Sequence, residues 1–238
     1  MYVSKWKQYK ILSKDKEIVP FLPKTAPLTV KRLWQMIDQY SEVIIKPKRG
    51  RLGRRVIRLA LLENNQFQIH SEDKLITVNG RDETFAYLTE QELTEGFIVQ
   101  HAIPLATINH CPFVIHLIVQ RRSNSSTWVT TGMLARVASE GYFITSVTNQ
   151  IIPVETAIES SSLHDVSFND LICEINHVVL LAANRFFESY PSCQLIGMDI
   201  GIDIHGDIWI LDADFNPMIT LFKWLDDPGM YERIKSYL

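Results

Sequence analysis

Residues 195–214 alternate apolar and polar side chains with a period of two, which is typical of β-strands that bury one face. The pattern predicts two strands, 194–204 and 207–214. His205 and Gly206 between them fit a two-residue hairpin turn, in which glycine is favoured. We therefore expect an antiparallel hairpin whose register is fixed by its buried face.

That register places acidic side chains together. Asp199 is expected opposite Asp212, and Gly197 opposite Asp214, with Asp203 on the same face nearer the turn. The opposite face is expected to pack in the core and carries Met198, Ile200, Ile202, Trp209, Leu211 and Ala213.

Facing carboxylates repel each other unless a cation balances them. Carboxylate oxygens suit hard ions such as Mg²⁺ or Mn²⁺, so Asp199, Asp212 and Asp214 form a candidate metal site. Gly197 is expected to leave room for a ligand beside Asp214. The alternative is an exposed hairpin face with solvated acids, which the apolar residues following Asp214 argue against.

A basic loop with two glycines, Gly50 and Gly53, lies between predicted strands at 43–45 and 56–62. Glycines let backbone N–H groups approach phosphate oxygens, and a lysine that ends the preceding strand adds a fixed charge. The loop is thus a candidate triphosphate site. A basic surface turn and a local nucleic-acid patch remain alternatives. The loop region has seven basic residues: Lys46, Lys48, Arg49, Arg51, Arg54, Arg55 and Arg58.

Composition limits the remaining possibilities. The 238 residues are 46% hydrophobic, so the chain has enough apolar residues for a sizeable core. A net charge of -3 argues against a general nucleic-acid binder. Three scattered cysteines fit a reducing cytoplasm, and the longest apolar run, 178–183, is too short to cross a membrane.

The rest of the chain predicts a mixture of helices and strands. Three prolines in residues 1–28 predict an irregular segment, and Thr29 is a candidate N-cap for a helix. Further expected elements are short strands around a helix at 83–95, a strand at 97–100, a hairpin of 113–120 with 128–138, a long helix at 168–190, and a short helix after Pro228.

The order of these parts resembles the ATP-grasp superfamily, and more closely the YheC/YheD proteins of spore-forming bacteria. The similarity extends over about residues 6–218. It is carried by Trp6, 22–25, 45–47 with Gly50 and Gly53, 97–100, 119–121, 135–137, Thr148 with Asn149, and 201–203.

The resemblance implies an α+β ATP-grasp fold in which two α+β lobes clasp a nucleotide. It divides the chain into an N-terminal extension (1–28), a glycine-loop lobe (29–100) and a C-terminal lobe with the metal site (101–238). The implied activity is that of an ATP- and Mg²⁺-dependent carboxylate–amine ligase acting through an acylphosphate, with an unidentified carboxylate or amine substrate. A cytoplasmic protein, with association to the spore, is the implied location.

The same resemblance assigns roles to individual residues. Arg136 and Asn149 are expected to face the transferred phosphoryl group, and Asp199, Asp212 and Asp214 to bind metal. The nucleotide-binding residues are expected to be Lys46, Gly50, Arg51 and Gly53 on the phosphates, and Val99, Gln100 and Ile103 in the hinge that reads adenine.

Several positions depart from the family pattern. Val114 and His116 stand where an Asp-x-Arg pair is usual, Arg55 replaces a common glycine, and no Gly-Gly pair follows Asn149. These departures favour an alternative, a catalytically impaired relative with a spore-coat or assembly role. A phosphotransferase that uses the same clasp is a more distant alternative, and a structural role is more typical for a histidine such as His116 in an apolar strand.

Overall fold

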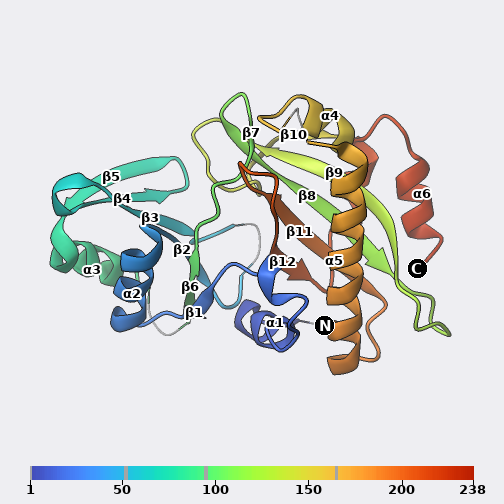
Figure 1. The fold of residues 1–238 in the computed structure, drawn as a ribbon, viewed down its shortest axis with the longest axis horizontal. Coiled ribbons are helices and arrows are strands. Elements are labelled where there is room, and N and C mark those ends of the chain that lie inside the picture. The colour runs from blue at the N-terminus through green and yellow to red at the C-terminus, as the bar shows by residue number, and fades with distance from the viewer. Residues whose placement is uncertain (1, 51–52, 94–95, 164–165) are drawn as a thin grey trace.

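The computed structural model describes residues 2–50, 53–93, 96–163 and 166–238 (Figure 1). Within these ranges the strands form two antiparallel sheets, one in each lobe. The glycine-loop lobe has the strand order β1-β6-β2-β3-β4-β5. Its strands are β1 (Thr25–Pro27), β2 (Glu42–Pro47), β3 (Ile57–Leu61), β4 (Gln66–Ser71), β5 (Lys74–Asn79) and β6 (Phe97–His101).

Two helices, α2 (Val30–Tyr40) and α3 (Gly80–Glu90), pack on this sheet. The Thr29 hydroxyl accepts a hydrogen bond from the Arg32 N–H and caps α2, as the sequence predicts. The helix buries Leu33, Met36 and Ile37 against the sheet. A short 3₁₀ turn, η2 (Glu63–Asn65), connects β3 and β4.

The C-terminal lobe has the strand order β10-β9-β8-β11-β12, and β7 pairs with β8. Helix α5 (Phe168–Ser189) covers one face of the sheet (Figure 1) and buries one apolar side, including Ile175, Val179 and Phe186. The strands are β7 (Thr107–Ile108), β8 (Cys111–Gln120), β9 (Val129–Ala138), β10 (Thr148–Ile152), β11 (Leu195–Ile202) and β12 (Ile208–Asp214).

Shorter helices complete this lobe. Helix α4 (Val154–Glu159) packs on β9. Residues Phe222 of η3 (Ile219–Trp224) and Ile234 of α6 (Gly229–Lys235) pack on the sheet face opposite α5. They cover only part of that face, and the acidic residues lie on the remainder.

The N-terminal segment is not irregular, and this prediction was wrong. Residues Lys5–Leu12 form helix α1, which packs against α5 (Figure 1), and Val19–Phe21 form the 3₁₀ turn η1. Ile11, Leu12 and Ile18 belong to the same core as α5. The three prolines come after α1, so they shape the return of the chain toward β1 and do not disrupt the helix.

The acidic hairpin has the predicted pairing at its three candidate metal ligands. Asp199 faces Asp212, and Gly197 faces Asp214. The turn is longer than predicted, however, because Ile202 pairs with Ile208. A register shift at Leu211 restores the pairing of the acids.

This shift corrects the predicted core face. Ile208 and Ile210 belong to the core, whereas Trp209 and Leu211 lie on the face of the acids. Trp209 Nε1 donates a hydrogen bond of 2.9 Å to Asp203 Oδ2. Asp203 also accepts the backbone N–H groups of His205 and Asp207, so this buried carboxylate stabilises the turn.

In the ranges that the structure describes, no helix is both long and apolar enough to cross a membrane.

Candidate functional site

The candidate site lies where the two lobes meet. A cavity at this place is lined by residues of both sheets and of the N-terminal helix: Lys5, Thr25, Lys46, Gln100, Leu211 and Asp212. The neighbouring strands β8, β9 and β11 contribute His116, Arg136 and Asp199. Side chains from seven strands and one helix thus come together at this position.

Asp199 is held by two side chains of its own sheet. Its Oδ1 lies 2.7 Å from His116 Nδ1, and its Oδ2 accepts a hydrogen bond of 2.7 Å from Arg136 Nη2. Burial opposes ionisation of Asp199, but Arg136 and then His116 outweigh burial and hold the pKa of this carboxyl well below its ordinary value. Asp199 is therefore a carboxylate at neutral pH.

Asp212 forms an ion pair with Lys5, the first residue of α1. Its other oxygen, Oδ1, accepts the N–H of Ala213 at 3.0 Å. Burial tends to lower the pKa of Lys5, but Asp212 outweighs burial and raises it. Sequence reasoning missed Lys5 altogether, because no local pattern connects a lysine near the N-terminus with the hairpin 207 residues later.

Asp214 lies opposite Gly197, as predicted, and its Oδ1 accepts the N–H of Asn216 at 2.9 Å. The expected space for a ligand beside Gly197 does not exist. A Cβ added at Gly197 would lie 2.6 Å from Cβ of Pro217 and 3.3 Å from Cε1 of His116. Gly197 instead lets Pro217 and the His116 ring pack closely against β11.

Lys46 reaches the site from β2 of the other lobe. Its buried ammonium donates a hydrogen bond of 3.1 Å to the carbonyl of Leu211. Burial lowers the pKa of Lys46 to about 8, although the negative charge of Asp212 opposes this shift. An anion such as a phosphate group near Lys46 would favour the protonated form.

The glycine loop contacts both the N-terminal segment and the C-terminal lobe. Gly50 donates its N–H to the Tyr2 hydroxyl at 2.9 Å. Gly53 has a φ of +66°, and it packs so closely on Ser146 and Ile144 that a Cβ would collide with both. Arg51 lies outside the described residues.

Not all basic residues of the loop region point toward the site. Arg55 has a φ of +60°, a conformation in which glycine is favoured. Its guanidinium donates to the carbonyls of Gln91 and Glu92. Arg58 forms an ion pair with Glu42. Both arginines therefore stabilise the glycine-loop lobe itself.

The predicted hinge residues lie at the end of β6 and directly after it. Val99 is fully buried between β1 and β2, and Gln100 Nε2 donates to the Thr25 hydroxyl at 2.8 Å. Ile103 is partly exposed. The side chains of Val99 and Gln100 are thus occupied within the lobe, and their backbones pair with β1 on one side and β2 on the other. Ile103 comes after the last residue of β6 and lies outside this pairing.

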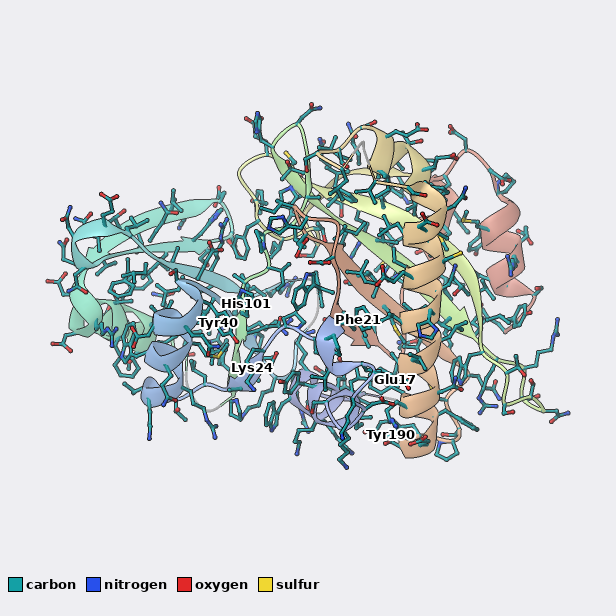
Figure 2. The ribbon with its side chains drawn as sticks, in the orientation of Figure 1. Glu17, Phe21, Lys24, Tyr40, His101 and Tyr190 are labelled. Atoms are coloured by element: carbon teal, nitrogen blue, oxygen red, sulfur yellow. The ribbon has the colours of Figure 1, made fainter. Side chains whose placement is uncertain are left out.

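His101 follows Gln100 and was not predicted to take part. Its ring stacks on Tyr40 with centroids 4.1 Å apart, and Trp209 lies edge-on at 6.3 Å. Figure 2 shows Tyr40 and His101 side by side where the glycine-loop lobe faces the C-terminal lobe. Burial lowers the pKa of His101, so the ring is neutral at neutral pH.

Asn149 is an exposed residue on β10, where the pairing of β9 with β10 shifts register. The hydrogen bonds found around Asp199 in the described residues come from His116 and Arg136 and do not include Asn149. The structure therefore brings Arg136 to the acids but leaves Asn149 at the margin of the site. His116, interpreted from the sequence as structural, contacts Asp199 directly.

The three aspartates provide the hard oxygen ligands that Mg²⁺ and Mn²⁺ prefer, and their register puts them on one face. As they stand, no three His, Cys, Asp or Glu side chains of the described residues gather closely enough to hold a metal ion. Lys5 and Arg136 already balance the charges of Asp212 and Asp199. The three aspartates have the ligand chemistry for such a metal ion, and Asp212 could bind it once the Lys5 ammonium has left this carboxylate.

Comparison with known proteins gives a consistent result. The sequence model of a family described as YheC/D like ATP-grasp matches residues 1–238. Endospore coat-associated protein YheD of Bacillus subtilis (strain 168) is 22% identical over 232 residues, which cover 93% of this chain and 50% of YheD. Endospore coat-associated protein YheC of the same strain is 22% identical over 219 residues, which cover 90% of this chain and 59% of YheC. The chain thus spans about half the length of these curated relatives.

Solved structures show the same fold at low sequence identity. Carboxyaminoimidazole ribonucleotide synthase from Aspergillus clavatus, complexed with ATP, has a TM-score of 0.55 and 13% identity over 90% of this chain and 45% of that chain. The ATP-grasp ligase PsnB, complexed with a minimal precursor, Mg and ADP, has a TM-score of 0.54 and 13% identity over 99% of this chain and 59% of that chain.

Proposed function

This chain belongs to the YheC/D like ATP-grasp family, and on that premise we propose that it binds ATP together with a divalent cation between its two lobes. The observation that carries the proposal is the convergence of Lys46 from one lobe with Leu211 and Asp212 from the other. Among the described residues, the hydrogen bond found for the buried Lys46 ammonium goes to the Leu211 carbonyl, so this group has donors left for a phosphate.

The nucleotide would lie along the cavity between the lobes. Lys46 and the glycine loop with Gly50, Arg51 and Gly53 would hold its phosphates. Adenine would be read at the end of β6, where the backbone of Ile103 follows the paired residues Val99 and Gln100. Asp199, Asp212 and Asp214 would hold Mg²⁺ or Mn²⁺. When bound, the cation supplies charge that offsets the charge on the phosphate oxygens.

The activity that fits these residues is carboxylate–amine ligation. A carboxylate oxygen of the substrate attacks the terminal phosphorus of ATP, the bond to the bridging oxygen breaks, and ADP leaves. An amine then attacks the acyl carbon, inorganic phosphate leaves, and a proton passes to water. Arg136 would stabilise the negative charge during phosphoryl transfer, and Asn149 would contribute at the margin of the site.

A second candidate is a catalytically impaired relative that binds ATP without turnover and acts in the spore coat or its assembly. The contacts of Asp199 with His116 and of Asp212 with Lys5 favour it, because both acids are engaged by the protein itself. The curated relatives are also named as endospore coat-associated proteins. In this case the protein would fold in the cytoplasm before joining the spore.

Thermal unfolding with ATP, with and without Mg²⁺, tests the shared part of both candidates. At a ligand concentration of about 100 times Kd, binding to the native state adds about 2.7 kcal/mol, which corresponds to a rise in Tm of about 5–10 °C for a chain of this size. Asp212→Asn is expected to remove most of the Mg²⁺-dependent part. No shift at millimolar ATP would refute the proposal, and phosphate release in the presence of candidate amines and carboxylates separates the ligase from the impaired relative.

A further inference from the structure

Lys5 lies at one of the three acids that the proposed function assigns to metal. Its ammonium forms an ion pair with Asp212, and its side chain is only 16% exposed. Asp199, directly opposite Asp212, has its own cationic partner in Arg136. Two of the three acids, Asp199 and Asp212, are therefore each balanced by a cation of the chain.

From this arrangement we propose that Lys5 is an internal counter-ion that competes with the divalent cation for Asp212. This inference rests on the proposed metal site and adds a mode of regulation to it. While Lys5 is in place, the carboxylate of Asp212 is neutralised and the site binds metal weakly. Displacement of Lys5 frees the carboxylate, so the position of α1 sets the affinity for metal.

The geometry explains why Lys5 does not simply turn away. Its backbone N–H donates to the carbonyl of Lys48 at 3.0 Å. One turn further along α1, the Gln8 carboxamide hydrogen-bonds to the backbone of Ala213, next to Asp212. Helix α1 is thus held on both sides of the Lys5 side chain: the Lys5 backbone is bound to Lys48, just after β2, and the Gln8 side chain is bound to β12.

The Lys5 ammonium and a divalent cation cannot both occupy this site, because their positive charges repel each other. Facing strand residues have Cβ atoms about 4.5–5.5 Å apart, so a divalent ion between Asp199 and Asp212 would lie close to the Lys5 ammonium. Two positive charges at that distance repel each other, and the Asp212 oxygen that binds Lys5 would be lost to the ion. Metal entry therefore requires that Lys5 leave this oxygen.

Release of Lys5 also bears on the glycine loop. Tyr2, three residues before Lys5, accepts the N–H of Gly50 through its hydroxyl. The segment from Tyr2 to Lys5 therefore contacts the glycine loop and the acid hairpin at the same time. A cation that displaces Lys5 loosens a segment that also holds the phosphate-binding loop.

Binding of Mn²⁺ to the nucleotide-free full chain tests this inference, with free Mn²⁺ measured by electron paramagnetic resonance. Lys5→Met removes the competing charge and should tighten Mn²⁺ binding by about tenfold, since a hydrogen bond to a charged group is worth about that much in affinity. Lys5→Gln is expected to act in the same direction, and Lys5→Arg should bind as the wild type does. Lys10→Met is the matched control, because it removes an exposed charge from the same helix.

The outcomes separate the inference from the proposed function. The inference is overturned if folded Lys5→Met and Lys5→Gln bind Mn²⁺ no more tightly than the wild type does. It is also overturned if Lys10→Met increases the Mn²⁺ affinity as much as Lys5→Met does. A gain that persists in Lys5→Met with Asp212→Asn also overturns it, because the ion then binds elsewhere. Failure of the wild type to bind ATP would refute the proposed function and leave the Mn²⁺ comparison intact.

Discussion

The carboxamide of Gln8 forms two hydrogen bonds with the backbone of Ala213. Its Nε2 donates to the carbonyl oxygen at 2.7 Å, and its Oε1 accepts the N–H at 3.3 Å. Ala213 lies on β12, the last strand of its sheet. One side chain therefore supplies the donor and the acceptor that a further strand would supply.

Replacement of Gln8 should show how much this contact contributes. Gln8→Leu leaves two buried backbone groups of Ala213 without these partners, and we expect a loss of about 1–3 kcal/mol in the free energy of unfolding. Urea unfolding measures the loss. Gln8→Glu retains the acceptor but places a buried carboxylate oxygen against the carbonyl oxygens of Val3 and Ala213, and it should cost at least as much as Gln8→Leu. A neutral effect of Gln8→Leu would mean that α1 does not stabilise this edge of the sheet.

Asp203 stabilises the turn of the acid hairpin through three hydrogen bonds, from the N–H groups of His205 and Asp207 and from Trp209 Nε1. Asp203→Ala should cost about 2–3 kcal/mol, because three donors around a buried carboxylate lose their acceptor. Asp207→Ala removes an acid from the same turn but leaves the acceptor in place and serves as the control. Equal losses in the two variants would contradict this role of Asp203.

The hairpin also shows what sequence can and cannot predict. The pairing of Asp199 with Asp212 was predicted correctly, but it results from two irregularities that compensate for each other, so alternation alone did not determine the register. The longer turn and the extra residue at Leu211 were not predicted. A glycine with positive φ, such as Gly206, fits turns of several lengths, and the hydrogen bonds to the Asp203 side chain and backbone stabilise this one.

Long-range contacts limited the prediction of the site more strongly. The helix from Val30 to Tyr40 followed from local signals, a Thr29 cap and apolar residues at helical spacing. The pairing of Lys5 with Asp212 joins residues 207 positions apart and leaves no trace in either local sequence. The sequence therefore indicated which acids share a face but not which cations balance them.

Gly53 should tolerate a side chain less well than another glycine with positive φ. Gly53→Ala adds backbone strain of about 1–2 kcal/mol and a clash with Ser146 and Ile144 that costs a further 1–3 kcal/mol or so. Gly141 has a φ of +80° but no heavy atom within 4 Å of an added Cβ, so Gly141→Ala should show the strain alone. Chemical unfolding compares the two, and titration with ATP reports whether the contact between glycine loop and C-terminal lobe supports nucleotide binding. Similar losses in both variants would mean that the packing of Gly53 on Ser146 is not tight.

The buried ammonium of Lys46 should make stability depend on pH in a defined direction. Its pKa is lowered from 10.5 to about 8 by burial, so between these values the unfolded chain binds a proton that the folded chain does not. Stability from this group therefore rises with pH in that window, by up to about 1.4 kcal/mol per pH unit, and is constant below about pH 8. Lys46→Met lacks this titrating group. The quantity to measure is therefore the difference in the free energy of unfolding between wild type and Lys46→Met, from pH 7 to 10.

The free energy of unfolding of the wild type should rise relative to that of the variant as pH rises. A difference that is independent of pH would mean that Lys46 keeps its ordinary pKa, and that its contact with the Leu211 carbonyl leaves the ammonium well solvated.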